Sequence, residues 1–176
     1  MKKILSNDYQ KIFSEKRSFE VDGKIHEYEK IEIEANDGVV AILASSGGLF
    51  FEDHKRINGN SLEFLRGYLE KDETPIAGAK RESLEELNIN ENDIVGCSFI
   101  GKVYPDNAFI KQTIYVVLIQ LKSSIKDVKL QSNEGVNNLL WYDQQEILEK
   151  INHDKVSDSF TLCAYMLLLA KKQSKY

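Results

Sequence analysis

Runs of apolar residues mark the expected strands of this chain. Ile31 and Ile33 alternate with charged neighbours, which is typical of a strand with one buried face. Residues 39–44 form a continuous apolar run, and so does the centre of the segment 112–121. Such runs predict strands that are buried on both faces. Shorter apolar segments predict further strands at residues 49–51, 94–104 and 139–142.

A hairpin is predicted close to the N-terminus. Asp22-Gly23 separates two short segments, residues 19–21 and 24–28, and this dipeptide favours a tight two-residue turn. A small ribbon of this kind is marginal by itself, so we expect it to pack on the main domain or on a second subunit. The pattern therefore predicts a β ribbon over residues 1–37 and one main domain over residues 38–176.

The clearest predicted helix lies in the middle of the chain. Pro75 suits a first helical turn, and Thr74 before it can cap the free amide groups. We expect this helix to run to Leu87 and to end at Asn88, because asparagine tolerates the left-handed conformation of a helix end.

Two more helices are predicted in the C-terminal part of the chain. Asp143 and Glu146 form a capping-box pattern before a helix over residues 144–151. Ser157 or Asp158 then caps a final helix that ends near residue 172. Its apolar stripe is expected to form core, and it comprises Phe160, Leu162, Cys163, Met166, Leu167 and Leu169. Strands and helices thus interleave, which predicts an α/β fold with a mixed sheet covered by helices on both sides.

Three glutamates share one face of the central helix. Glu82, Glu85 and Glu86 are three and four residues apart, and these spacings bring side chains together on a helix. Arg81 reaches Glu85 at i,i+4, whereas Glu82 and Glu86 have no lysine or arginine at such a spacing. A divalent cation would relieve the repulsion, and carboxylates without histidine or cysteine favour Mg²⁺ or Mn²⁺. The alternative for three glutamates alone is a solvated acidic face.

The spacing of the surrounding residues favours the metal site. The segment 67–89 resembles the Nudix box, Gly-x5-Glu-x7-Arg-Glu-aliphatic-x-Glu-Glu-x-Gly-aliphatic. The matching residues are Gly67, Glu73, Arg81, Glu82, Glu85, Glu86 and Ile89. Ser83 replaces an aliphatic residue and Asn88 replaces a glycine, so neither departure affects a charged position.

The resemblance implies a Nudix-type α/β/α sandwich and a role for each matching residue. Glu82, Glu85 and Glu86 would bind Mg²⁺ together with the main-chain carbonyl of Arg66, and Glu82 and Glu86 would be catalytic. Glu73 and Arg81 would tie the loop after Gly67 to the helix. Related enzymes often place a general base in a loop after the buried strand, which makes Glu134 the candidate; a solvated loop carboxylate is the alternative.

A wider likeness suggests a substrate. Arg56 followed by the segment 63–70 is similar to the ADP-ribose pyrophosphatase branch of Nudix hydrolases, and so is Tyr104-Pro105-Asp106. Leu65 departs from that branch, which usually has proline there. The ribbon occupies the place of a dimer-forming region, so a homodimer is expected.

The implied reaction is Mg²⁺-dependent cleavage of ADP-ribose to AMP and ribose 5-phosphate. Arg56 and Arg66 could clamp phosphate, because a guanidinium matches its oxygens; an ordinary surface charge is the alternative for Arg56. The rings of Phe51, Tyr28 and Tyr104 could stack on the ligand or simply pack. Alternative functions are hydrolysis of another nucleotide sugar, a dinucleotide polyphosphate or an oxidised nucleotide, and ligand sensing without catalysis.

Composition narrows the possible partners. The 176 residues are 42% hydrophobic, which is enough for one domain with a substantial core. The net charge of −5 argues against a nucleic-acid partner. Cys97 and Cys163 are far apart, so they are expected to be reduced thiols of a cytoplasmic protein. No apolar stretch approaches the length that spans a membrane, so no membrane partner is expected.

Overall fold

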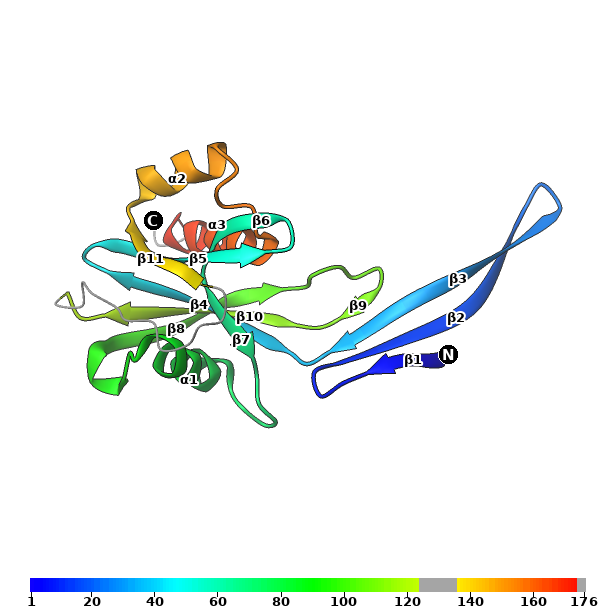
Figure 1. Cartoon of the computed structure of the whole chain (residues 1–176), viewed down its shortest axis with the longest axis horizontal. Helices are drawn as coiled ribbons and strands as arrows, with labels where there is room; N and C mark the ends of the chain where they lie inside the picture. Colours follow the sequence, from blue (N-terminus) through cyan, green and yellow to red (C-terminus); the bar gives the residue numbers. More distant parts are fainter. Residues whose placement is uncertain (124–135, 174–176) are drawn as a thin grey trace.

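The computed structural model describes residues 1–123 and 136–173 and places them in two β-sheets and three α-helices (Figure 1). A long β ribbon extends from one side of an α/β body. The strands are β1 (Lys2–Ser6), β2 (Gln10–Val21), β3 (Lys24–Ala35), β4 (Gly38–Ser45), β5 (Gly48–Arg56), β6 (Gly59–Glu63), β7 (Leu65–Tyr68), β8 (Ile94–Val103), β9 (Ile110–Lys111), β10 (Ile114–Leu121) and β11 (Val136–Tyr142). The helices are α1 (Pro75–Leu87), α2 (Gln144–Asn152) and α3 (Ser159–Gln173), with a short 3₁₀ turn at Glu91–Asp93.

The larger sheet is mixed, as predicted. Its strand order is β11-β5-β4-β10-β8, and β6 and β7 pair with β5 and β4 respectively. The two continuous apolar runs form the parallel pair at its centre, β4 and β10. Ile42 and Leu43 of β4 and Val117 and Ile119 of β10 are fully buried. The other pairs of this sheet are antiparallel.

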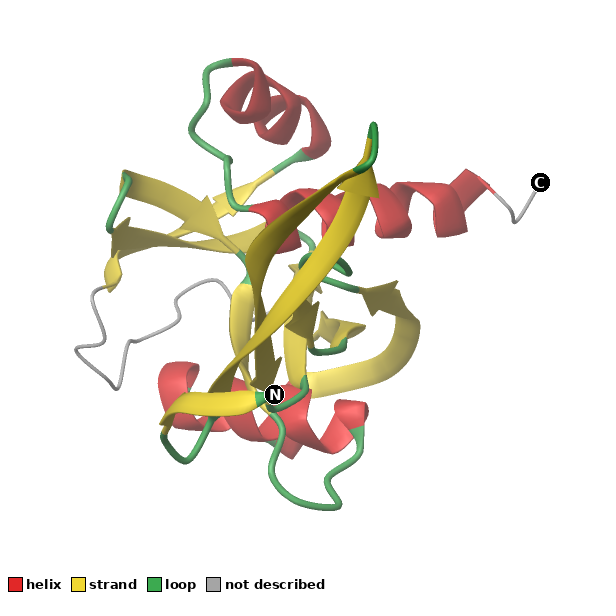
Figure 2. Cartoon of the chain, turned by 90° about the vertical axis from the view of Figure 1, so that its right-hand side faces the viewer, coloured by secondary structure: helices red, strands yellow, loops and turns green. Residues whose placement is uncertain are grey.

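Helices cover both faces of this sheet (Figure 2). On one face Val39 and Leu43 pack in a cluster with Ala79 and Leu87 of α1. On the other face alternate residues such as Ile42 pack in a second cluster with residues of α2 and α3. Two successive residues of β4 therefore serve opposite cores, as the alternation of side chains in a strand requires. The arrangement confirms the predicted α/β/α sandwich.

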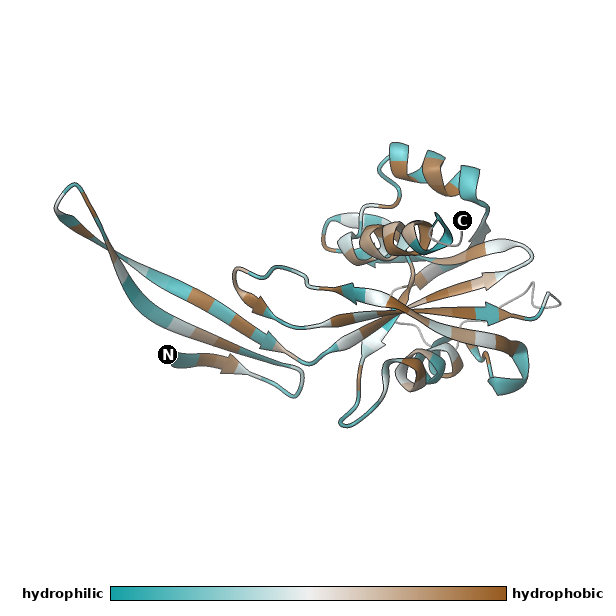
Figure 3. Cartoon of the chain, turned by 180° about the vertical axis from the view of Figure 1, so that it is seen from behind, coloured by the Kyte–Doolittle hydropathy of each residue, from teal (hydrophilic) through white to brown (hydrophobic). Residues whose placement is uncertain are grey.

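The N-terminal ribbon is longer than the sequence pattern suggested. β2 and β3 pair over twelve residues each, and the predicted turn lies between them with Asp22 and Gly23 at φ 52° and 72°. β1 adds a strand that the polar pattern of residues 1–18 did not reveal. Most of this ribbon is exposed, so the alternation at Ile31 and Ile33 does not mark the buried face that it predicted, and Ile31 is 40% exposed. Hydrophobic and hydrophilic segments alternate along the ribbon in Figure 3. Its fourth strand, β9, comes from the main body.

The charged segment after Phe51 corrects one prediction. The strand predicted at residues 49–51 is longer than expected, because β5 continues through Glu52 and His54 to Arg56 and turns directly into β6, which the sequence pattern did not predict. Glu52 and Glu63 lie opposite each other and are each only 1% exposed. The charged residues hid this hairpin, yet its two buried carboxylates are paired: Glu52 contacts His54, and Glu63 binds Arg56 and Arg66.

The predicted apolar stripe of α3 is confirmed in part, because Phe160, Leu162, Leu167 and Leu169 are partly buried and pack against the core. The buried residues of this helix are Thr161, Ala164, Tyr165 and Leu168, whereas Cys163 is exposed and Met166 is 62% exposed. Much of the helix surface is apolar, so periodicity alone does not determine which face docks on the sheet. No helix within the described residues is long and apolar enough to cross a membrane.

Candidate active site

Helix α1 begins and ends where the sequence predicted. The hydroxyl of Thr74 accepts a hydrogen bond from the amide of Ala77 at 3.3 Å, and Pro75 opens the helix. Asn88 ends it in the left-handed conformation with φ 55°. The hydroxyl of Ser83 donates to the carbonyl of Ala79 at 2.7 Å. Both departures from the box thus fit the geometry of the helix.

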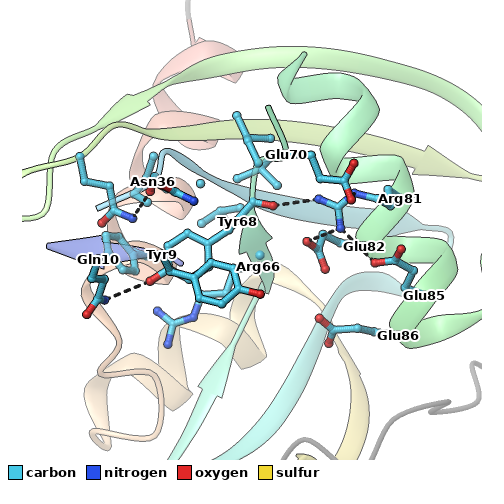
Figure 4. A pocket seen from close by; sticks show the side chains of 18 of the residues that line it. Tyr9, Gln10, Asn36, Arg66, Tyr68, Glu70, Arg81, Glu82, Glu85 and Glu86 are labelled. Atoms are coloured by element: carbon cyan, nitrogen blue, oxygen red, sulfur yellow. Dashed lines mark hydrogen bonds and ion pairs between the residues drawn. The ribbon is translucent and has the colours of Figure 1, made fainter. Parts of the chain in front are cut away.

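The three box glutamates lie along the side of α1 that borders a pocket of about 1010 Å³ (Figure 4). Glu82 is 8% exposed and lies deepest, Glu86 is partly buried, and Glu85 is exposed. Burial raises the pKa of Glu82, and the neighbouring guanidinium of Arg81 opposes that rise. A carboxylate in this position is stabilised by positive charge.

The main chain of β7 runs against Glu82. A Cβ atom at position 67 would collide with the carboxylate of Glu82, so only glycine leaves room for both the strand and the side chain. Gly67 pairs with Val39 of β4, which fixes the strand in the sheet. The glycine of the box therefore acts by permitting close approach.

Arg81 connects the loop, the strand and the glutamates. Its Nε and Nη2 atoms donate to the two carboxylate oxygens of Glu73, each at 3.0 Å, and Nη2 also donates to the carbonyl of Tyr68 at 2.8 Å. Its Nη1 atom donates to Glu82 at 2.8 Å and to Glu85 at 3.0 Å. These contacts raise the pKa of Arg81 and lower that of Glu73.

The contact with Glu82 corrects an inference from helix spacing. Helix geometry alone left Glu82 without a cation at three or four residues, but the guanidinium reaches it from the adjacent position because Glu73 and Tyr68 hold the Arg81 side chain across the helix. The expected pairing of Arg81 with Glu85 is present.

The contacts of Arg81 with Glu82 and Glu85 affect how well these carboxylates fit a metal ion. Within residues 1–123 and 136–173, no three histidine, cysteine, aspartate or glutamate side chains converge to hold one. Arg81 engages one oxygen of Glu82 and one of Glu85. The donor chemistry nevertheless suits Mg²⁺ or Mn²⁺, since the helix presents hard carboxylate oxygens and the described residues that line the pocket include no cysteine.

A second wall of the pocket is basic. Arg56 and Arg66 both line the pocket, and both bind the buried carboxylate of Glu63, with distances of 2.7 Å and 3.1 Å. Arg66 also pairs with Asp158 and lies over the ring of Phe160 at 5.3 Å. The fold thus brings both arginines to the same cavity as the box glutamates.

Aromatic and amide side chains at the other end of the pocket were not found from the sequence. The rings of Tyr9 and Tyr68 stack with their centroids 5.0 Å apart, and the Gln10 amide donates to the Tyr68 hydroxyl at 3.1 Å (Figure 4). Asn36 lies beside them. Gln10 and Tyr68 are 58 residues apart, and no local pattern links them.

The aromatic residues considered from the sequence lie outside this pocket. Phe51 is fully buried in the core beside α3, Tyr28 lies on the ribbon, and Tyr104 borders a different hollow. Glu134, the candidate base, lies outside the described residues.

Comparisons with known proteins place the chain in a family. A crystal structure of an ADP compounds hydrolase matches with a TM-score of 0.75 and 14% sequence identity, over 99% of this chain and 92% of the other. That likeness establishes the fold, including the ribbon. Comparison with curated proteins gives no match. The NUDIX domain profile matches residues 34–161, which is most of the chain and includes the whole box. The chain therefore belongs to the Nudix domain family.

Proposed function

We propose that this Nudix pyrophosphohydrolase cleaves the pyrophosphate bond of a nucleoside diphosphate linked to another moiety, with ADP-ribose as the first choice. The observation that carries the proposal is the two-sided pocket. Glutamates of α1 form one wall, and Arg56 and Arg66 belong to the other. A diphosphate needs positive charge around its oxygens, and this pocket has both arginines and carboxylates suited to a divalent cation.

The chain's own residues would bind and orient the diphosphate. Arg56 and Arg66 donate to phosphate oxygens, while Glu63 and Asp158 hold the two guanidinium groups in place. Arg81 and Glu73 keep the loop and the helix in register. When bound by Glu82, Glu85, Glu86 and the Arg66 carbonyl, Mg²⁺ or Mn²⁺ supplies positive charge at the phosphate oxygens and activates water.

The reaction gives two phosphomonoesters. Water attacks one phosphorus, the bridging bond from that phosphorus breaks, and the bridging oxygen leaves on the other phosphate with the electron pair. With ADP-ribose the products are AMP and ribose 5-phosphate. The proton of the attacking water goes to a base, for which Glu134 remains a prediction.

The remainder of the pocket suits the other parts of such a molecule. Tyr9 and Tyr68 offer aromatic surface, and Gln10 and Asn36 offer amide groups that can recognise a base or sugar. The name of the structurally similar ADP compounds hydrolase supports an adenosine diphosphate derivative over the alternatives. Those alternatives are another nucleotide sugar, a dinucleotide polyphosphate and an oxidised nucleotide.

A turnover screen with product identification tests this proposal. The purified protein is incubated with ADP-ribose, other nucleotide sugars, dinucleotide polyphosphates and oxidised nucleotides, with Mg²⁺, with Mn²⁺, and with a chelator alone. We expect cleavage of ADP-ribose only with added metal, and AMP and ribose 5-phosphate by mass. Preferred cleavage of another class would reassign the substrate.

A second candidate function is ligand sensing without catalysis. The engagement of Glu82 and Glu85 by Arg81 favours it, because that guanidinium occupies part of the expected cation site. Calorimetry separates the two functions. Binding of ADP-ribose in the presence of Mg²⁺ without any product would establish the sensor, whereas metal-dependent product formation would exclude it.

We also propose that the protein is a cytoplasmic homodimer formed through the ribbon. Phe19, Val21, Ile25 and Tyr28 on β2 and β3 are 47% to 73% exposed. Apolar side chains gathered on a projecting ribbon are typical of a surface that another chain covers.

A further inference from the structure

A buried polar pair belongs to the pocket wall beside the arginines. Atom Nε2 of His54 lies 3.0 Å from Oε2 of Glu52, and the two residues are 6% and 1% exposed. Phe51, directly before Glu52, packs in the cluster beside α3, so Glu52 and His54 face the opposite side of the sheet, where α1 lies. His54 lines the same pocket as Arg56 and Arg66.

The carboxylate of Glu52 has fewer polar partners than the carboxylate of Glu63. Glu63, directly opposite on β6, receives ion pairs from Arg56 and Arg66. Within the described residues, Oε1 of Glu52 has no hydrogen-bond partner, and the same is true of Nδ1 of His54. A buried polar atom without a partner is uncommon in folded proteins and often marks a functional position.

The contact with Glu52 fixes the orientation of the imidazole. An ionised carboxylate only accepts hydrogen bonds, so Nε2 carries the hydrogen in this pair and Nδ1 is left for another partner. Atom Nδ1 is buried without a partner in a side chain that lines the pocket, so we assign a phosphate that enters beside the ring as its partner. A phosphate beside the ring would be a second anion next to His54, and two anions favour the protonated imidazole.

The charges around His54 come from several elements. They are Glu52 and Arg56 of β5, Glu63 of β6, Arg66 of β7, Asp158 before α3, and Glu82, Glu85 and Glu86 of α1 across the pocket. On its own wall the three buried or partly buried carboxylates exceed the two guanidinium groups by one charge. A proton on His54 would balance that wall when a phosphate enters.

We propose that His54, oriented by Glu52, is a diphosphate-binding residue of this pocket and takes up a proton when the diphosphate binds. The inference rests on the proposed function for the class of ligand, but not on turnover. It adds a third basic group to the wall that contains Arg56 and Arg66, through a hydrogen bond from Nδ1 to a phosphate oxygen.

Imidazole NMR of the whole protein tests binding without any metal or catalysis. The chain has three histidines, and the variant His54→Gln assigns the signal of His54. The protein is titrated with inorganic pyrophosphate in the presence of a chelator. We expect the His54 signal to move toward the protonated position, while His26 on the ribbon and His153 after α2 stay in place. A stationary His54 signal at the end of the titration would overturn the proposal.

Kinetics on two variants provide a second measurement. For His54→Gln and for Glu52→Gln we expect KM to rise about tenfold with kcat within about threefold, because a charged hydrogen bond to the substrate is lost. His153→Gln is the matched control and should leave both constants unchanged. Unaltered KM together with a lower melting temperature would show that the pair is only structural.

The two proposals fail in different ways. If the His54 signal moves with pyrophosphate but no substrate is hydrolysed, the binding residue stands and the proposed reaction fails. If ADP-ribose is hydrolysed but His54 does not respond to pyrophosphate, the reaction stands and this inference fails.

Discussion

Single residues of the box differ in how closely the fold constrains them. Glu82 is enclosed by β7 and by Arg81, and Gly67 has no room for a side chain beside it. Glu85 is exposed on the outer turn of the same face. Substitutions at Glu82 and Gly67 should therefore have the sharper effects.

Removing one carboxylate charge from the pocket should abolish most of the activity. For Glu82→Gln and Glu86→Gln we expect turnover to fall by about a hundredfold or more, since a neutral amide is a poor ligand for a hard cation. Turnover at saturating Mg²⁺ is measured alongside circular dichroism. Glu91→Gln is the control, because Glu91 pairs with Lys80 outside the pocket. Near wild-type turnover in either box variant would remove the metal-site assignment.

A methyl group at position 67 should act through Glu82. Gly67→Ala places a Cβ where the carboxylate lies, so either the strand or the side chain must shift. We expect turnover to fall by about tenfold or more, as expected when a catalytic group is displaced. In Gly47→Ala the added carbon meets only ordinary contacts, so this variant should retain activity. Equal turnover of the two variants in the same assay would show that close approach at Gly67 is unimportant.

At the scale of elements, the loop before α1 is tied to the helix by charge. Glu73 accepts from Arg81 and from the amide of Glu70 at 2.9 Å. The same arginine holds the carbonyl of Tyr68, so the end of β7, the loop and the helix share one guanidinium. Thr74 then caps the helix directly after Glu73.

This tie should make stability depend on pH. Arg81 lowers the pKa of Glu73 in the folded protein. The stabilisation is therefore present above the unfolded value of about 4.3 and is lost as pH falls through the lower folded value. Urea unfolding of the wild type and Glu73→Gln should differ most at neutral pH, and the difference should shrink as the pH falls below about 4.3 and through the lower folded value. A constant difference across this range would contradict the assignment.

At the scale of the whole molecule, the ribbon stands apart from the body that carries the pocket (Figure 1). Its base contributes to that pocket, because Tyr9 and Gln10 lie at the turn between β1 and β2 and contact Tyr68 of β7. Its far end exposes apolar side chains and projects away from the body (Figure 1). The ribbon therefore has two features to explain. Its base contributes to the pocket, and its exposed apolar end points to contact with a second copy of this chain.

Light scattering tests the proposed dimer. The wild type should show twice the chain mass of 20.2 kDa. The double variant Phe19→Ser/Ile25→Lys should be monomeric because it replaces exposed apolar contacts of the ribbon by polar groups. Ile57→Ser, at the exposed turn between β5 and β6, is the control and should stay dimeric. A monomeric wild type at micromolar concentration would refute the dimer.

Much of helix α1 was predictable because its signals are local. Thr74, Pro75 and Asn88 determine both ends of α1, and the spacing of Glu82, Glu85 and Glu86 places them on one face. The Asp22-Gly23 turn was predictable for the same reason, since two residues carry its conformational preference. The length of the ribbon was not, because residues 1–18 gain their structure only by pairing with other strands.

The sequence by itself thus determined the family, the central strands, helix α1 and its acidic face, because each depends on residues close together in the chain. Only the tertiary structure decided that Arg81 binds Glu82, that Glu52 and His54 are buried, and that Tyr9 meets Tyr68. These contacts depend on which strands become neighbours in the sheet and on side-chain directions, and the chain sets both only when it packs around its core.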